Sequence, residues 1–354
     1  MISEGSHSGK GVVKGRAAAY LKTPMYWYPT IPRVLMVVLP VEILTLVLFP
    51  DVAHNRLYWI AIGVTAPFVA WFFVYWRVYQ SVFVTRKPVS SEPISPRWKP
   101  FTFSGWGNES LKAYLVESDE GSEDLLLYLH GYNSRMSRGE SRSLHIHRMG
   151  LNVISLDQRG FGTQGKRHDW TLLKVIADIE GLLDHTPTLL GFTPRRLWIY
   201  GHSMGGFLTI RLSSHPSSWW EGALKAIILE SPAASFPKII DSKLPGRAVM
   251  AKPWVRHILR REHERIHPDL NIRYANAELP YSGIPKVPAL VIQSENDETL
   301  GNEHFDLIQK HMSHISEIHV LDMPHTSTVD TNERRELVEK WMKNQLELTE
   351  ATYQ

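Results

Sequence analysis

The sequence has no cysteine among its 354 residues, which excludes disulfide bonds, thiolate catalysis and cysteine-based zinc sites. It also lacks a strong charge of one sign, because 39 Lys and Arg residues are nearly balanced by 36 Asp and Glu residues. The basic residues are scattered rather than gathered in a stripe, so we expect no nucleic-acid partner. No internal repeat or low-complexity tract is present either. A length of 354 residues suits one large domain with an appendage.

The N-terminal part contains two long apolar runs. Leu57–Trp76 carries no charge and is long enough to cross a bilayer, whereas Val34–Phe49 is shorter and contains Glu42. Only a short segment separates the runs, and aromatic residues flank them as they do at membrane interfaces. This pattern predicts a transmembrane helical hairpin over residues 34–76. The alternative is a helical pair packed on the rest of the protein.

Charge predicts how this hairpin is oriented. Basic residues are concentrated in the segment 1–33 before it and in the Pro- and Ser-rich linker 77–100 after it. The loop between the runs offers only Arg56, which Asp51 balances. The positive-inside rule then predicts a multi-pass integral membrane protein with both ends, and so the C-terminal domain, in the cytoplasm.

After the linker the pattern is that of an α/β domain. Two amphipathic strands are followed by six short apolar runs of the kind expected for strands buried on both faces, and helical spacing lies between these runs. The eight expected strands are Phe101–Ser104, Leu111–Val116, Leu125–Leu129, Val153–Leu156, Leu197–Tyr200, Ala226–Leu229, Ala289–Ile292 and Ile318–Leu321. The rhythm stops over residues 232–283, so the expected core comprises 101–231 and 284–348, followed by a tail at 349–354.

The motif Gly201-His202-Ser203-Met204-Gly205 follows one of these strands and precedes an apolar helical pattern. This order is required for a nucleophile elbow, a tight strand-to-helix turn that exposes a serine hydroxyl. Small residues on either side of Ser203 allow the strand and the helix to approach each other. The alternative is a glycine-rich turn with a surface serine.

A serine hydroxyl needs a base to accept its proton and an acid to orient that base. In hydrolases with this elbow, the acid and then the histidine follow the serine along the chain. His325 lies just after the last expected strand, and Asp297 lies just after the strand before it. We therefore expect Ser203, Asp297 and His325 to form a catalytic triad. Glu230, at the end of an earlier strand, is the alternative acid.

The tetrahedral intermediate of acyl transfer needs two N–H donors for its oxyanion. One is the amide of Met204, which follows the nucleophile. The other is expected from the loop His130-Gly131-Tyr132 after Leu125–Leu129, with the Tyr132 amide as donor.

These motifs together resemble the α/β-hydrolase superfamily, in the branch that holds monoacylglycerol lipases, serine-aminopeptidase-like hydrolases and membrane-anchored abhydrolase-domain proteins. The resemblance implies the α/β-hydrolase fold, with a mostly parallel eight-stranded sheet flanked by helices, and a helical cap over residues 232–283. It also implies hydrolysis of an ester, thioester or amide without a metal or an organic cofactor. Ser294, where a glycine often precedes the acid, and Thr163-Gln164 depart from the pattern. The residues that carry the resemblance are His130-Gly131, Asp157–Gly162, Gly201–Gly206, Ser294–Asp297 and His325.

The expected cap also contains His263-Glu264-Arg265-Ile266-His267, which matches the His-Glu-x-x-His zinc motif. Arg265 would place a cation beside the metal, and Pro268 follows the second histidine and favours the end of the helix. A solvated helix end accounts better for this segment than a zinc metalloprotease does.

The sequence as a whole predicts a membrane-anchored serine hydrolase that cleaves lipid-like carboxylic esters, such as a monoacylglycerol, a lysolipid or another acyl ester. Three alternatives stay open. They are a tethered hydrolase of soluble esters or acyl thioesters, a zinc metalloprotease, and a binding protein on a hydrolase fold.

Overall fold

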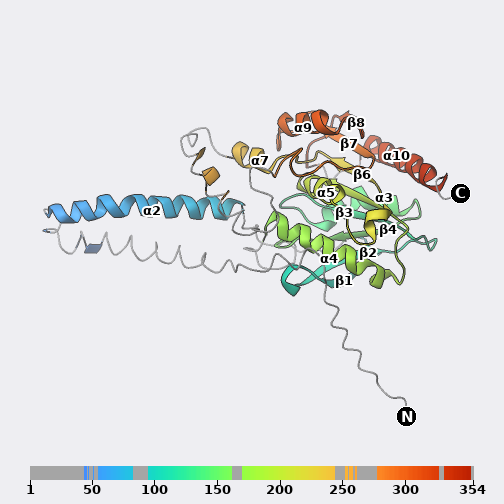
Figure 1. Ribbon diagram of the computed structural model, residues 1–354, viewed down its shortest axis with the longest axis horizontal. Coiled ribbons are helices and arrows are strands. Elements are labelled where there is room, and N and C mark those ends of the chain that lie inside the picture. The colour runs from blue at the N-terminus through green and yellow to red at the C-terminus, as the bar shows by residue number, and fades with distance from the viewer. Residues whose placement is uncertain are drawn as a thin grey trace, which may run out of the picture.

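The computed structural model describes residues 44–45, 47, 51, 55–82, 95–161, 170–243, 252–253, 255–257, 260, 277–326 and 331–351. Its centre is one eight-stranded sheet in the order β1-β2-β4-β3-β5-β6-β7-β8 (Figure 1). The strands are β1 (Lys99–Ser104), β2 (Ser110–Val116), β3 (Asp124–Leu129), β4 (Asn152–Leu156), β5 (Arg196–His202), β6 (Leu224–Glu230), β7 (Ala289–Ser294) and β8 (Ser316–Leu321). Each contains one of the eight expected runs, so the predicted sheet is confirmed.

The sheet is mostly parallel. β2 pairs antiparallel with β1 and with β4. From β4 onwards in the spatial order, β4-β3-β5-β6-β7-β8, every pair of neighbouring strands is parallel. Along β5, Leu197 and Ile199 belong to one hydrophobic cluster while Trp198 and Tyr200 belong to another. This alternation follows from the two-residue period of a strand. It explains why the central strands read as continuous apolar runs, since both faces of the sheet are covered.

Two sets of helices cover the two faces (Figure 1). Side chains of α4, α5 and α9 join the first cluster, and side chains of α3 and α10 join the second. Thr171 caps the start of α4 by accepting a hydrogen bond from the Lys174 amide, and Gly191 ends the helix at φ 77°. The helices of the domain are α3 (Glu140–His147), α4 (Leu172–Leu190), α5 (Met204–Ser214), α6 (Trp220–Ala223), α7 (Phe236–Lys243), α9 (Asn302–Met312) and α10 (Asn332–Ala351), with short 3₁₀ turns η3 (Trp106–Asn108) and η4 (Met136–Gly139).

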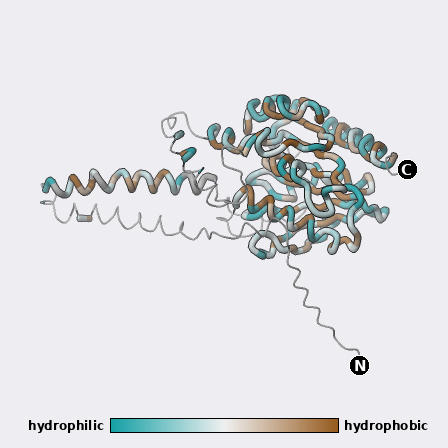
Figure 2. Tube along the Cα trace, in the orientation of Figure 1, coloured by the Kyte–Doolittle hydropathy of each residue, from teal (hydrophilic) through white to brown (hydrophobic). Residues whose placement is uncertain are grey.

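Helix α2 (Arg56–Val82) projects from the α/β domain (Figure 1). Among the described residues, its segment Tyr58–Arg77 is the one helix whose length and composition would suit a membrane crossing. Hydrophobic positions recur along the projecting part (Figure 2), and large apolar side chains such as Phe68 are exposed there. Near its C-terminal end, Tyr75 is buried in the first hydrophobic cluster of the domain, and Trp71 stacks on it.

Two expected boundaries differ from the structure. α2 continues to Val82, into the segment expected to be linker. α10 continues to Ala351, into the expected tail, because Arg196 donates to Leu346 O and to Thr349 Oγ1 in its last turns.

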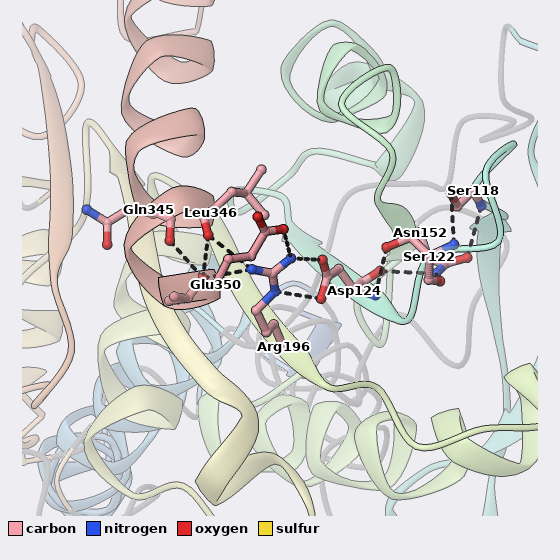
Figure 3. Close-up of polar contacts among 9 residues, drawn as sticks. Ser118, Ser122, Asp124, Asn152, Arg196, Gln345, Leu346 and Glu350 are labelled. Atoms are coloured by element: carbon pink, nitrogen blue, oxygen red, sulfur yellow. Dashed lines mark hydrogen bonds and ion pairs between the residues drawn. The ribbon is translucent and has the colours of Figure 1, made fainter. Parts of the chain in front are cut away.

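Arg196 belongs to a polar network at the amino end of the parallel strands (Figure 3). Its guanidinium forms a bidentate pair with Asp124, including an Nε to Oδ1 distance of 2.8 Å, and reaches Glu350 at 3.3 Å. Asn152 extends the network by donating to Asp124 O at 3.0 Å. These contacts join β3, β4 and β5 to α10.

The expected cap leaves the domain and returns to it at one place. The Phe236 amide donates to Ala277 O at 2.8 Å, and the Leu279 amide donates to Ala234 O at 2.9 Å. Most of residues 244–276 lies outside the described residues, and so do nearly all of the first predicted membrane helix and the His263–His267 motif.

Candidate active site

The serine motif forms a sharp turn between β5 and α5. Ser203 has φ 55° and ψ −119°, a strained conformation that projects its side chain between strand and helix. A side chain at Gly201 would collide with Gly205 O, and one at Gly205 would collide with Leu129 O. The two glycines are therefore required by the close approach of β5, α5 and the end of β3.

The three residues of the predicted triad lie together at the carboxyl edge of the sheet. Ser203 Oγ lies 2.9 Å from His325 Nε2, and His325 Nδ1 lies 2.7 Å from Asp297 Oδ2. A carboxylate can only accept, so Nδ1 carries the imidazole proton and Nε2 is left to accept from the serine hydroxyl. His325 and Asp297 are both 5% exposed. This arrangement can transfer the serine proton to the imidazole.

Asp297 is held by the loop that follows it. Its Oδ1 accepts from the amides of Thr299 at 3.0 Å and Leu300 at 2.9 Å. Burial by itself would raise the pKa of Asp297. The hydrogen bond and charge of His325, together with these two amides, outweigh burial and hold the pKa below its ordinary value. The carboxyl group is therefore ionised and fixed in place beside the imidazole.

Glu230, the alternative acid, lies at the end of β6 but is paired elsewhere. Its Oε1 accepts from Arg142 Nε at 2.8 Å, and its Oε2 accepts from the Tyr200 hydroxyl at 2.5 Å. Burial opposes ionisation, yet Arg142 and neighbouring cationic groups lower the pKa of Glu230 to about 2. Of the two candidate acids, the structure brings Asp297 to His325 and assigns Glu230 to a buried ion pair.

The predicted oxyanion loop lies against the elbow. A Cβ at Gly131 would come within 3.0 Å of the Ser203 Cβ. His130 is fully buried; its Nδ1 donates to Gly131 O at 2.7 Å and its Nε2 accepts from the Gln158 amide at 3.0 Å. The ring of Tyr132 packs edge-on against Trp170, with centroids 4.9 Å apart. The loop that carries the Tyr132 amide is thus fixed next to Ser203, and Met204 begins α5 on the other side.

Several residues around this site make contacts that the sequence did not indicate. Ser294, a departure from the family pattern, donates its hydroxyl to Met323 O and so ties the acid loop to the loop of His325. Arg142 lies on α3 in no recognisable motif, and the sequence gives no signal for its buried contact with Glu230. His202 was expected only as a part of the elbow, yet its Nε2 lies 2.7 Å from His325 O.

In the part of the chain that the structure describes, no group of three or more His, Asp or Glu side chains is arranged to hold a metal ion. The His263-Glu264/His267 motif lies outside that part.

The sheet, the elbow at its carboxyl edge and the order of the residues define an α/β hydrolase. The chain belongs to the family described as serine aminopeptidase, S33, whose pattern matches residues 121–307.

Solved structures share this fold at low sequence identity. The chain is similar to an esterase of Pyrococcus furiosus, with 21% identity and a TM-score of 0.54 over 75% of this chain and 98% of that one. It is also similar to the esterase Est1E of Butyrivibrio proteoclasticus, with 18% identity and a TM-score of 0.52 over 70% and 98% of the two chains. These likenesses show the fold.

Two relatives are similar in sequence over shorter stretches. Alpha/beta hydrolase domain-containing protein 17C of Xenopus laevis is 33% identical over 129 residues, which is 35% of this chain and 38% of that protein. The uncharacterized protein YfhR of Escherichia coli K12 is 26% identical over 155 residues, which is 41% of this chain and 50% of that protein. The chain thus spans half or less of the length of these relatives.

Proposed function

We propose that the protein is a membrane-anchored serine hydrolase that cleaves carboxylic esters through an acyl-enzyme. The observation that carries the proposal is the continuous hydrogen-bonded chain from Ser203 Oγ through His325 to Asp297, at 2.9 and 2.7 Å. The strained elbow and the fixed carboxylate support it, because both preorganise the serine for attack.

In the proposed reaction, Ser203 Oγ attacks the acyl carbonyl carbon while its proton moves to His325 Nε2. The imidazolium then returns the proton to the leaving alcohol as the ester C–O bond breaks. Water repeats the sequence on the acyl-enzyme, releasing the acid and restoring the serine. Asp297 stabilises the imidazolium and keeps Nδ1 protonated throughout. The chemistry needs no metal and no organic cofactor.

The proposed oxyanion hole consists of the main-chain amides of Met204 and Tyr132. Met204 is the first residue of α5, so its N–H belongs to the positive end of a helix. The approach of Gly131 to Ser203 supports the second donor, because it keeps the following amide beside the attacked carbonyl.

A serine-reactive fluorophosphonate tests the chemistry. We expect the wild-type protein to be labelled and Ser203→Ala to be unlabelled, with ester hydrolysis lost in parallel. Activity removed by a chelator would point to the zinc alternative. Absence of both labelling and hydrolysis in the folded wild-type protein would point to a binding role.

We propose a lipid-like acyl ester as the substrate, for example a monoacylglycerol or a lysolipid. The support is the apolar helix α2, which joins the catalytic domain directly through buried Tyr75. p-Nitrophenyl esters of increasing chain length, assayed with and without detergent micelles, test this assignment. We expect preference for long chains and higher rates with micelles. Preference for acetyl or butyryl esters without that enhancement would favour the soluble-ester alternative, and faster turnover of acyl thioesters would favour the thioester one.

We propose that the hairpin 34–76 anchors the chain with both ends in the cytoplasm. The exposed apolar side chains of α2 support contact with lipid, because Phe68 and Ile60 are 63% and 62% exposed. The natural absence of cysteine allows a direct test. In intact cells, a membrane-impermeant maleimide should label Asn55→Cys in the loop before α2. It should label Ser313→Cys on the catalytic domain only after permeabilisation, and equal labelling of both without permeabilisation would contradict the orientation.

A further inference from the structure

His202, the residue before the candidate nucleophile, contacts the loop that carries the candidate base. It is 7% exposed at the end of β5, and its Nε2 lies 2.7 Å from the main-chain oxygen of His325. A carbonyl oxygen only accepts, so His202 Nε2 carries a proton and donates it. The two imidazole rings lie 5.3 Å apart between centroids and are tilted by 46°. His202 therefore holds the backbone of His325, and the side chain of His325 is left to meet Ser203.

The other ring nitrogen of His202 faces the oxyanion loop. A Cβ at Gly131 would lie 3.3 Å from His202 Nδ1 and 3.0 Å from the Ser203 Cβ. The ring thus fills the space between the loop of Gly131 and the loop of His325.

The surroundings keep this imidazole neutral. Burial lowers the pKa of His202 to about 3, and the positive charge of Arg142 acts in the same direction, while Glu230 opposes it. Arg142 is itself paired with Glu230, whose second oxygen accepts from Tyr200. A neutral ring with its proton on Nε2 is the one form that donates to His325 O without adding a charge beside the candidate base.

We propose that His202 is a positioning residue. It fixes the main chain of His325, so that the imidazole of His325 stays within reach of Ser203, and it packs against Gly131, so that the oxyanion loop keeps its position. The proposal rests on the proposed serine-hydrolase function. His202 acts through these two loops and does not take part in the transfer of protons. Displacing a reacting group by about 1 Å costs up to about 100-fold in rate, so even a small relaxation of the His325 loop should be measurable.

The pair His202→Gln and His202→Asn tests the proposal. Both are neutral amides that differ by one methylene, but the amide nitrogen of glutamine reaches the place of His202 Nε2 and that of asparagine does not. We expect His202→Asn to lower kcat by about 30-fold to 100-fold with KM changed much less, and His202→Gln to stay within about 5-fold of wild type. Rates are expressed per folded molecule, with the folded fraction taken from near-ultraviolet circular dichroism.

His147 offers a matched control. It is also buried, and its Nδ1 contacts the Leu151 main-chain oxygen at 3.2 Å, but Leu151 precedes β4 and lies at the opposite edge of the sheet. His147→Asn and His147→Gln should change the unfolding midpoint without changing kcat per folded molecule.

Equal kcat values for His202→Asn and His202→Gln, whether high or low, would overturn the proposal. So would a loss in His202→Asn that disappears once the folded fraction is corrected. Failure of the proposed function is a separate result, because it would appear as wild-type protein that the fluorophosphonate does not label at Ser203.

Discussion

A buried carboxylate paired with a nitrogen donor lies at each end of the parallel strands, at what we call the amino edge and the carboxyl edge of the sheet. The two pairs differ in what the nitrogen donor can do. At the amino edge, Asp124 pairs with the guanidinium of Arg196, which stays protonated at every working pH. At the carboxyl edge, Asp297 pairs with the imidazole of His325, whose second ring nitrogen can accept a proton from Ser203 and return it. The permanently charged guanidinium can only hold its carboxylate in place, whereas an imidazole can also transfer a proton.

The largest effect is expected at the carboxyl edge. Ser203→Ala, His325→Ala and Asp297→Asn should each lower kcat by about 1,000-fold or more, because the three groups act as one unit. The unfolding midpoint should change little. Steady-state hydrolysis of a p-nitrophenyl ester and thermal unfolding measure the two quantities.

Glu295→Gln is the control for this set, because Glu295 is an exposed carboxylate two residues from Asp297 along the chain. It should keep wild-type turnover. Near-normal turnover in His325→Ala would refute the assignment of the base and remove the contrast between the edges.

The opposite result is expected at the amino edge. Arg196→Met leaves Asp124 buried without its partner and should lower the free energy of unfolding by about 3–5 kcal/mol. Turnover per folded molecule should be unchanged, because the network in Figure 3 lies at the other end of the strands. Urea unfolding of the purified protein measures the loss.

Adding Asp124→Leu to Arg196→Met removes the unpaired charge and should restore part of that stability. If Arg196→Met instead lowered kcat as the carboxyl-edge variants do, the two edges would be coupled. The assignment of a structural role to the amino edge and a catalytic role to the carboxyl edge would then fail.

The carboxyl edge was largely predictable from the sequence. Its strands are short apolar runs, and the parallel order brings the residues that follow them to one edge. The glycines around Ser203 mark a turn that only small residues permit. Both Asp297 and Glu230 follow expected strands, so the sequence alone leaves two candidates for the acid of the triad. Choosing between them requires the side-chain geometry, in which the amides of Thr299 and Leu300 hold one carboxylate at His325 while Arg142 holds the other.

The buried polar pairs were not predictable, because their partners are far apart in sequence. His202 and His325 are 123 residues apart, Arg142 and Glu230 are 88 apart, and Arg196 and Asp124 are 72 apart. Such pairs leave no periodic pattern, since each depends on the register between strands and on how a helix packs. The last turns of α10 were missed for the same reason.

A smaller effect is expected in the pH dependence of stability, which should be altered by a change at the carboxyl edge and not by one at the amino edge. His304, at the start of α9, accepts from the amides of Ala234 and Ser235 through Nδ1, at 2.9 and 3.2 Å. Burial lowers its pKa to about 4, Lys238 adds to the shift, and Asp297 opposes it. In the unfolded chain a histidine titrates near 6.5, so unfolding takes up a proton between these values. Stability from this group is therefore complete above about pH 6.5 and is lost as the pH falls towards 4.

His304→Asn tests this contribution, because the asparagine side-chain oxygen takes the place of Nδ1 as acceptor but does not titrate. Near pH 5 the free energy of unfolding of wild type should fall more steeply on acidification than that of the variant, by about 1.4 kcal/mol per pH unit. Urea unfolding at pH 7, 6 and 5 measures the slopes. Arg196→Lys keeps a permanent cation at the amino edge and should retain the wild-type slope. Equal slopes for wild type and His304→Asn would show that the acid sensitivity of the fold does not originate in His304.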